Sequence, residues 1–412
     1  MRSGNVRWLA IASTALVLTL CFSGLSLPPP ASAATVTGQA GTKAPALIAI
    51  ARRAMKADHL RSVIFRVTVD GRPIVTQALG TSMTGVPATT AMHFRNGAVS
   101  FSYLATLLLE FVDEHRVSLN DTVARWMPSL PEANQVTLKM LANMTSGYPD
   151  FETDPTFTTE QETNPFKQWT VSELLSLAFS RPVLFPPGTN WSYAHTNMVI
   201  LGVILQKIGG KPLATLLRDK VLAPMGLNNT KNHSTPQIES PALHAYSSEQ
   251  RTYLGVPSSS PFYVESTFWS PSWGTPPGAA ETTNIFDMTK TAQEEGTGAL
   301  LSKASYRAMT GPNLLGFGHS LPTCQPACFT QIEPYNYGLG IVRSGSWLLQ
   351  NPLLSGEGAV EAYLPSKKIA VAVAVTFDPQ AFDSQGNYSN SSDVLWRQLA
   401  AYVAPSNAPP MH

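Results

Sequence analysis

The chain has 412 residues, which is longer than the chains that a single hydrophobic core usually organises. We therefore expect one large domain of two packed lobes, or two domains. Hydrophobic residues make up 43% of it and charged residues only 13%, a balance that excludes an intrinsically disordered chain. The 28 basic and 27 acidic side chains give a formal net charge of +1, so charge offers no basis for binding nucleic acid or an anionic membrane.

Residues 1–33 have the pattern of a signal peptide. Arg2 and Arg7 precede an apolar run over residues 8–27, and the small residues of Ala31-Ser32-Ala33 form a cleavage site before Ala34. An uncleaved membrane anchor is the alternative, because the apolar run is nearly long enough to span a bilayer. With either reading, the rest of the chain is secreted or lies in the cell envelope.

Residues 34–44 are aperiodic and rich in Thr, Gly and Ala, as expected of a flexible linker. Order is expected to begin near Pro45, with a helix of about three turns whose apolar side chains recur at helical spacing up to Met55. The apolar period then changes to that of a strand over residues 63–69. Asp70-Gly71 favours a tight hairpin turn before a second strand over residues 73–78.

A long helix is predicted from about Ala98 to His115, with a buried apolar stripe that makes it central. Residues 150–168 and 232–276 are predicted to be irregular segments at the rim of a cleft. The apolar run 369–376 predicts an interior strand, followed by a helix over residues 392–403. The fold class is therefore α+β, an antiparallel sheet flanked by terminal helices plus a helical lobe. We expect one domain over residues 45–405, with an α/β lobe from 45–95 and about 330–405, and a helical, loop-rich lobe over about 96–329.

Two cysteines remain after signal cleavage, Cys324 and Cys328. In an oxidising compartment they predict a structural disulfide that closes a small loop. No matching His or Cys pair lies nearby, so no metal site and no cofactor are expected.

Short sequence elements recur in the order found in one enzyme family, and together they cover about residues 60–376. They are Phe94-Arg95-Asn96-Gly97, Val112-Asp113-Glu114, Leu119-Asn120-Asp121, Thr145-Ser146-Gly147, Pro187-Gly188-Thr189, Ser192-Tyr193, Leu201-Gly202, Gly209-Gly210, Pro224-Met225-Gly226-Leu227, Thr230, Tyr337-Gly338-Leu339-Gly340 and Tyr363-Leu364-Pro365. In these elements the chain resembles the serine β-lactamase-like family, which includes class C β-lactamases, penicillin-binding proteins, D-alanyl-D-alanine carboxypeptidases and esterases.

The resemblance implies a Ser-x-x-Lys motif at the start of the central helix, where the lysine accepts the serine proton. Counting back without gaps from Asp113-Glu114, the serine position is Ala98 and the lysine position is Phe101. Neither side chain can do this chemistry.

The family's other two motifs are also altered. Tyr-x-Asn becomes Tyr193-Ala194-His195, which keeps the tyrosine and replaces the asparagine. Without the lysine, Tyr193 is expected to remain a neutral phenol. The Lys-Thr-Gly or His-x-Gly strand is replaced by residues 350–354, Gln-Asn-Pro-Leu-Leu, in which Pro352 lacks a backbone N–H.

Three functions follow from this reading. The first is an inactive family member, a pseudoenzyme, whose cleft binds a peptidoglycan-type peptide, another envelope molecule or a protein partner. The second is an active hydrolase with an unusual nucleophile, Ser102, assisted by Tyr193 and by His195 as base. The third is a structural envelope protein whose cleft is filled by Phe101 and the leucines of residues 353–354. The sequence leaves the oligomeric state open.

We predict that the mature protein begins at Ala34, because the cleavage site directly follows the apolar run and its helix-breaking prolines. N-terminal sequencing of exported protein should give Ala34-Thr35-Val36. Recovery of only the full-length, membrane-bound chain would support the anchor instead.

Overall fold

A nine-stranded sheet carries the fold, in the order β3-β2-β1-β14-β13-β11-β10-β9, with β12 paired to β13. All its ladders are antiparallel. The computed structural model describes residues 39–232, 235–277, 279–311 and 314–411. The predicted signal peptide and the first part of the predicted linker lie outside this range. Gly38–His412 form one compact unit, to which both predicted lobes belong.

The described strands are β1 Leu60–Val69, β2 Arg72–Met83, β3 Val86–Pro87, β4 His93–Arg95, β5 Lys231–Asn232, β6 Tyr246–Ser247, β7 Val264–Glu265, β8 Ala280–Asn284, β9 Asn336–Tyr337, β10 Val342–Ser344, β11 Trp347–Gln350, β12 Leu353–Leu354, β13 Glu357–Leu364 and β14 Ile369–Phe377. The α-helices are α1 Gln39–Ala57, α2 Val99–Asp113, α3 Leu138–Ala142, α4 Pro155–Thr163, α5 Val171–Ala178, α6 His195–Gly209, α7 Leu213–Leu217, α8 Ile285–Thr297, α9 Lys303–Thr310 and α10 Ser391–Val403.

The predicted hairpin is present as β1 and β2. Its two turn residues, Asp70 and Gly71, have φ values of 49° and 75°. Two central residues with positive φ match the right-handed twist of the flanking strands, which explains why Asp-Gly is favoured there.

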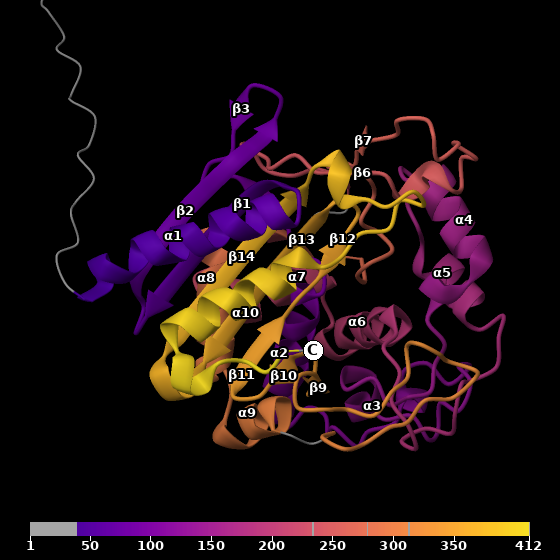
Figure 1. Ribbon diagram of the computed structural model, residues 1–412. Coiled ribbons are helices and arrows are strands. Elements are labelled where there is room, and N and C mark those ends of the chain that lie inside the picture. The colour runs from indigo at the N-terminus through magenta and orange to yellow at the C-terminus, as the bar shows by residue number, and fades with distance from the viewer. Residues whose placement is uncertain (1–38, 233–234, 278, 312–313, 412) are drawn as a thin grey trace, which may run out of the picture. The chain divides into compact units, whose positions relative to one another are not determined.

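Strand β14 is the interior strand that its apolar run predicted, since all nine of its residues are buried. Helices α1 and α10 lie together on one face of the sheet, and α8 packs against β14, β13 and β1 behind it (Figure 1). A strand covered on both faces needs apolar side chains at every position, so it reads as a continuous apolar run. The predicted α+β class, with terminal helices on an antiparallel sheet, is confirmed.

Helix α2 is the predicted central helix. Its side chains are buried almost throughout, from Val99 to Leu109 and again at Phe111. It packs against α6, α7 and α9 in the helical part of the unit. A helix apolar on all sides requires neighbours on all sides, and this fixes the position of its first turn.

Two boundaries differ from the sequence-based prediction. Helix α1 begins at Gln39, ahead of the predicted start near Pro45. Within the stretch 150–168, predicted to be irregular, a 3₁₀ turn over Phe151–Thr153 (η2) is followed by helix α4. Asp154 caps α4 by accepting a hydrogen bond from the Thr156 N–H, and Pro155 fits the first turn, where its missing N–H costs nothing. These local capping signals outweigh the shortage of apolar residues.

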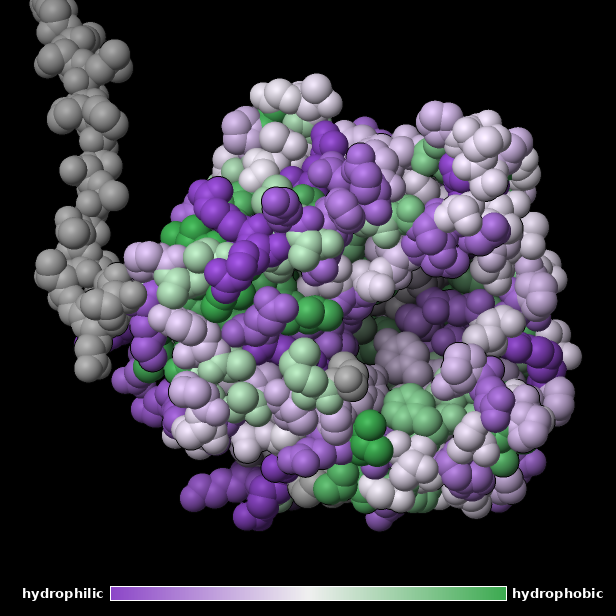
Figure 2. Space-filling view, viewed as in Figure 1, coloured by the Kyte–Doolittle hydropathy of each residue, from purple (hydrophilic) through white to green (hydrophobic). Residues whose placement is uncertain are grey.

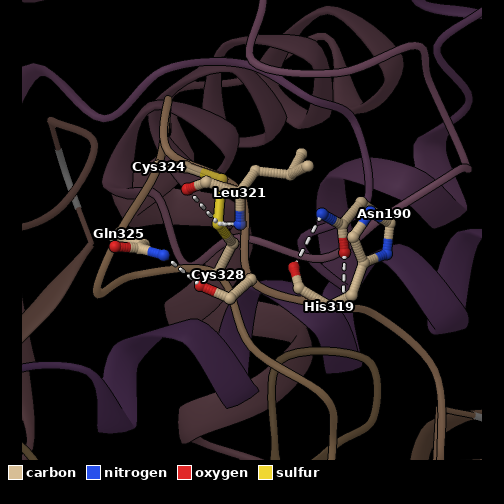
Figure 3. The surroundings of a disulfide bond; sticks show 7 residues. Asn190, His319, Leu321, Cys324, Gln325 and Cys328 are labelled. Atoms are coloured by element: carbon tan, nitrogen blue, oxygen red, sulfur yellow. Dashed lines mark hydrogen bonds between the residues drawn. A yellow bond between two sulfur atoms is a disulfide. The ribbon is translucent and has the colours of Figure 1, made fainter.

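The predicted disulfide between Cys324 and Cys328 is present, with the two Cα atoms 5.5 Å apart (Figure 3). Beside it, the Asn190 side chain donates to the His319 carbonyl at 3.0 Å and accepts from the His319 N–H at 2.8 Å. These bonds fasten the disulfide loop to the segment that leads into α6.

Among the described residues, no single helix has both the length and the apolar character needed to cross a membrane. The consecutive segments His195–Gly209 and Leu213–Leu222 would do so only as a pair, and they are bent by 77°.

Candidate functional site

A cleft of about 320 Å³ lies between the β11–β12 segment of the sheet and the starts of α2 and α6. Figure 2 shows this face of the molecule hollowed between β12 and the α4–α6 region. The cleft is lined by residues from six parts of the chain: Gly97, Ala98, Glu152, Tyr193, His195, Trp273, Gly274, Tyr335, Gln350, Asn351, Pro352, Leu353 and Leu354. The structure thus gathers the three altered motifs around one open cavity.

Ala98 occupies the N-cap position of α2 and lines the cleft. The preceding Gly97 has φ +46°, and a Cβ on it would lie 2.6 Å from Pro352 Cβ. Only glycine therefore fits between the helix start and the opposite wall. The nucleophile position is held in place by the backbone, but the side chain there is a methyl group.

Phe101, at the lysine position, is fully buried. Its ring centroid lies 6.1 Å from that of Tyr193 and 5.7 Å from that of His195. The phenyl ring therefore lies against both residues of the second motif, where it offers no proton acceptor.

Tyr193 lines the cleft as predicted. Burial is the main reason that its pKa is raised well above 10, and the neighbouring Tyr337 and Tyr335 act in the same direction. The hydroxyl thus remains protonated at neutral pH, and Tyr193 can donate a hydrogen bond but cannot act as a base.

His195, the first residue of α6, forms an ionic cluster with Asp150 and Glu152. Its Nδ1 lies 3.0 Å from Asp150 Oδ2 and 3.2 Å from Glu152 Oε2. Burial opposes the charge on the imidazole, but the carboxylates of Glu152 and Asp150 outweigh it and raise the His195 pKa to about 9. Burial, with the charge of Asp150, raises the Glu152 pKa to about 7 despite the opposing effect of His195. A protonated imidazolium is a poor general base at neutral pH.

The polar side chains of the opposite wall form hydrogen bonds with other parts of the protein. The Gln350 amide donates to the Gly340 carbonyl at 2.7 Å, and the Asn351 amide donates to Asp393 at 3.0 Å. Leu353 and Leu354 complete this wall. They line the cavity without closing it.

Ser102 does not line the cleft, and the structure does not bring it together with His195 as a nucleophile and base. Its side chain is fully buried, and its hydroxyl is hydrogen-bonded at 2.6 Å to both the Val99 carbonyl and Glu295 Oε1. Four residues along a helix give the same face but a position one turn deeper, and here that depth is closed by packing.

Sequence reasoning missed the partners of His195. Asp150 and Glu152 follow Thr145-Ser146-Gly147 closely in the chain, but no spacing rule connects them to a histidine more than forty residues later. Trp273 belongs to a segment predicted only to lie at the rim, yet its ring centroid lies 5.9 Å from that of the His195 ring. An adjoining hollow of about 230 Å³ shares Glu152 and Trp273 and adds Glu162 and Glu249. This end of the cleft therefore carries three carboxyl groups, and burial raises the pKa of each of them.

Comparison with known proteins agrees with this architecture. The family model described as Beta-lactamase matches residues 47–394. The chain is 30% identical over 131 residues to Penicillin-binding protein 4* of Bacillus subtilis (strain 168), which covers 32% of this chain and 28% of that protein. It is 30% identical over 152 residues to Penicillin-binding protein 4 of Amycolatopsis lactamdurans, covering 36% of this chain and 38% of that one. The chain thus spans less than half the length of these curated relatives.

Among solved structures, the D-amino acid amidase of Ochrobactrum anthropi SV3 complexed with L-phenylalanine amide superposes with a TM-score of 0.68. The match covers 88% of this chain and 99% of the amidase at 21% sequence identity, so it establishes a shared fold. The sequence-based resemblance and fold are both confirmed.

We predict that His195 makes the stability of the protein dependent on pH. Its folded-state pKa of about 9 lies above the ordinary 6.5, so the charged ring stabilises the fold fully below pH 6.5, and this contribution is lost as the pH rises through about 9. Urea unfolding of the natural protein and of His195→Asn, in buffer with EDTA, should show a stability difference that shrinks by more than about 1 kcal/mol across this window. A difference that does not change with pH would contradict the assignment.

Proposed function

Because this chain belongs to the β-lactamase family, we propose that it is a catalytically silent relative of the family's serine hydrolases, whose open cleft binds a ligand of the cell envelope. The observation that carries the proposal is the pair Ala98 and Phe101. Covalent catalysis on this scaffold needs a hydroxyl at the start of α2 and a base one turn later. A methyl group and a buried phenyl ring stand in those places.

Among the described residues, Ser102 and the remaining members of the altered motifs do not supply the missing chemistry. Tyr193 keeps its proton, His195 is held by two carboxylates, and the Gln350 amide is bonded to the backbone of Gly340. Ser102 is fully buried beneath the cleft, and its hydroxyl is hydrogen-bonded to Glu295. The alternative of a hydrolase built on Ser102 therefore finds no support in the geometry.

The open cavity supports binding over a purely structural role. Phe101 packs below Tyr193 and His195 and does not line the cleft, and the leucines of β12 leave about 320 Å³ accessible. A cavity of this size, with a few polar groups among aromatic walls, is typical of sites for small ligands.

The proposed ligand is a peptidoglycan-type peptide or another small envelope molecule. Two of the named relatives are penicillin-binding proteins, and other relatives are described as putative D-alanyl-D-alanine carboxypeptidases. The proposed location is outside the cytoplasm, in keeping with the signal-like N-terminus and with a disulfide, which is stable in oxidising compartments.

We predict that neither penicillin-type nor fluorophosphonate probes label the natural protein covalently, because no oxygen stands at position 98. Intact-mass spectrometry checks this. Ala98→Ser alone should gain little labelling, since no base accompanies the new hydroxyl. Ala98→Ser combined with Phe101→Lys should gain labelling only if the cleft and the opposite strand are otherwise competent. Turnover by the natural protein that is lost in Ser102→Ala would overturn the proposal.

We also predict that soluble peptidoglycan stem peptides bind in the cleft, as measured by isothermal titration calorimetry. Ala98→Trp should abolish the binding, because the indole would occupy the cavity. The matched control is Ala304→Trp, which places the same side chain at an exposed position on α9 and should bind as the natural protein does. Equal binding by both variants would place the ligand elsewhere, and no binding by the natural protein would remove this ligand class.

A further inference from the structure

We propose that Asp150, Glu152 and His195 form a binding site for a divalent metal ion, with Zn²⁺ the ion that best suits their donor atoms. No metal site is predicted from the sequence, in which His195 lies more than forty residues after Asp150 and Glu152. This inference concerns the same cleft as the proposed function but does not depend on it.

The spacing of the donor atoms fits an ion. One carboxylate oxygen from each acid and one ring nitrogen lie within 4.8 Å of one another. The imidazole Nδ1 lies 3.0 Å from Asp150 Oδ2 and 3.2 Å from Glu152 Oε2. Around a tetrahedral zinc with bonds of about 2.0–2.1 Å, neighbouring ligand atoms are about 3.3 Å apart. The two distances from the imidazole already match this spacing, and the two carboxylate oxygens, which lie within 4.8 Å of each other, would close on the ion.

The donors are held by ordered structure. Asp150 is the N-cap of η2, where its Oδ1 accepts from the Glu152 N–H at 3.3 Å, and its carbonyl accepts from Arg181 at 2.6 Å. The His195 ring lies among the rings of Phe101, Phe151 and Trp273. Ligands fixed in this way lose little conformational freedom when an ion binds, and this favours affinity.

A second observation also favours a bound cation. Glu152 Oε1 is buried and has no hydrogen-bond partner among the described residues. A buried carboxylate oxygen without a partner is costly, and an ion bound at Oε2 can also engage Oε1. The cluster also sets two carboxylates against a single imidazole, so a dication balances the charge better than one proton does.

An ion would have access to this site and would retain open coordination positions. Glu152 and His195 both line the cleft beside Ala98, whereas Asp150 is buried behind them. Three protein ligands leave the fourth position of a tetrahedral zinc free for water or a ligand group. A metal here would give the cleft an electrophilic contact close to the place where the family's serine is absent.

The test is a titration of Zn²⁺ into tag-free protein that has been stripped of metal with EDTA, measured by isothermal titration calorimetry. The absorption spectrum with Co²⁺ in place of Zn²⁺ probes the coordination. We expect one ion per chain. His195→Asn and Glu152→Gln should each weaken binding by at least about tenfold. The matched control is His244→Asn, which breaks a different histidine–carboxylate contact, between His244 and Glu265 at 2.5 Å, and should leave zinc binding unchanged.

Two results would overturn the proposal: no stoichiometric binding of Zn²⁺ by the natural protein, or equal binding by the natural protein and the folded variants. The cluster would then be an ion pair only. Circular dichroism checks folding, and if His195→Asn does not fold, Glu152→Gln decides alone. Since neither probe labelling nor peptide binding enters this titration, failure here and failure of the proposed function are distinguishable.

Discussion

Helix α2 is buried on almost all sides, and this burial determines where its first residues meet the cleft. The helix cannot shift or rotate without exposing apolar side chains along most of its length. Its N-terminus is further fixed by the close approach of Gly97 to Pro352, which joins the helical part of the unit to the edge of the sheet. Position 98 is therefore set by the core of the protein, whichever side chain it carries.

Phe101 stands where the sequence resemblance implies a lysine, and its uncharged ring lies against Tyr193 and His195. The carboxylates of Asp150 and Glu152, at 3.0 and 3.2 Å from the imidazole Nδ1, therefore act on the imidazole without a neighbouring cation at this position. The charged side chains among the residues that line the cleft, Glu152 and His195, thus lie in the η2 turn and at the start of α6.

Beneath the cleft, the hydroxyl of Ser102 contacts the carboxyl of Glu295, which with that of Glu361 forms a second set of buried polar side chains. Burial raises the pKa of Glu295 to about 8 despite its hydrogen bond with Ser102. Burial and the neighbouring Glu295 raise the pKa of Glu361 well above its usual range. These raised pKa values favour the protonated carboxyls at neutral pH, so Ser102 lies in a buried hydrogen-bonded cluster of low charge.

The sequence by itself determined the α+β class, the β1–β2 hairpin, the interior strand β14 and the central helix α2. These features rest on apolar periodicity and on one turn dipeptide, which are local signals. It also placed Ala98 and Phe101 at the altered motif, because the register along one helix is fixed by counting.

Only the tertiary structure decided that Ser102 is sealed from the cleft, that Gln350 and Asn351 are bonded within the fold, and that Asp150, Glu152 and His195 meet. The physical reason is that burial and electrostatic coupling depend on which segments pack together. Residues more than forty positions apart carry no mark in the sequence that they will become neighbours.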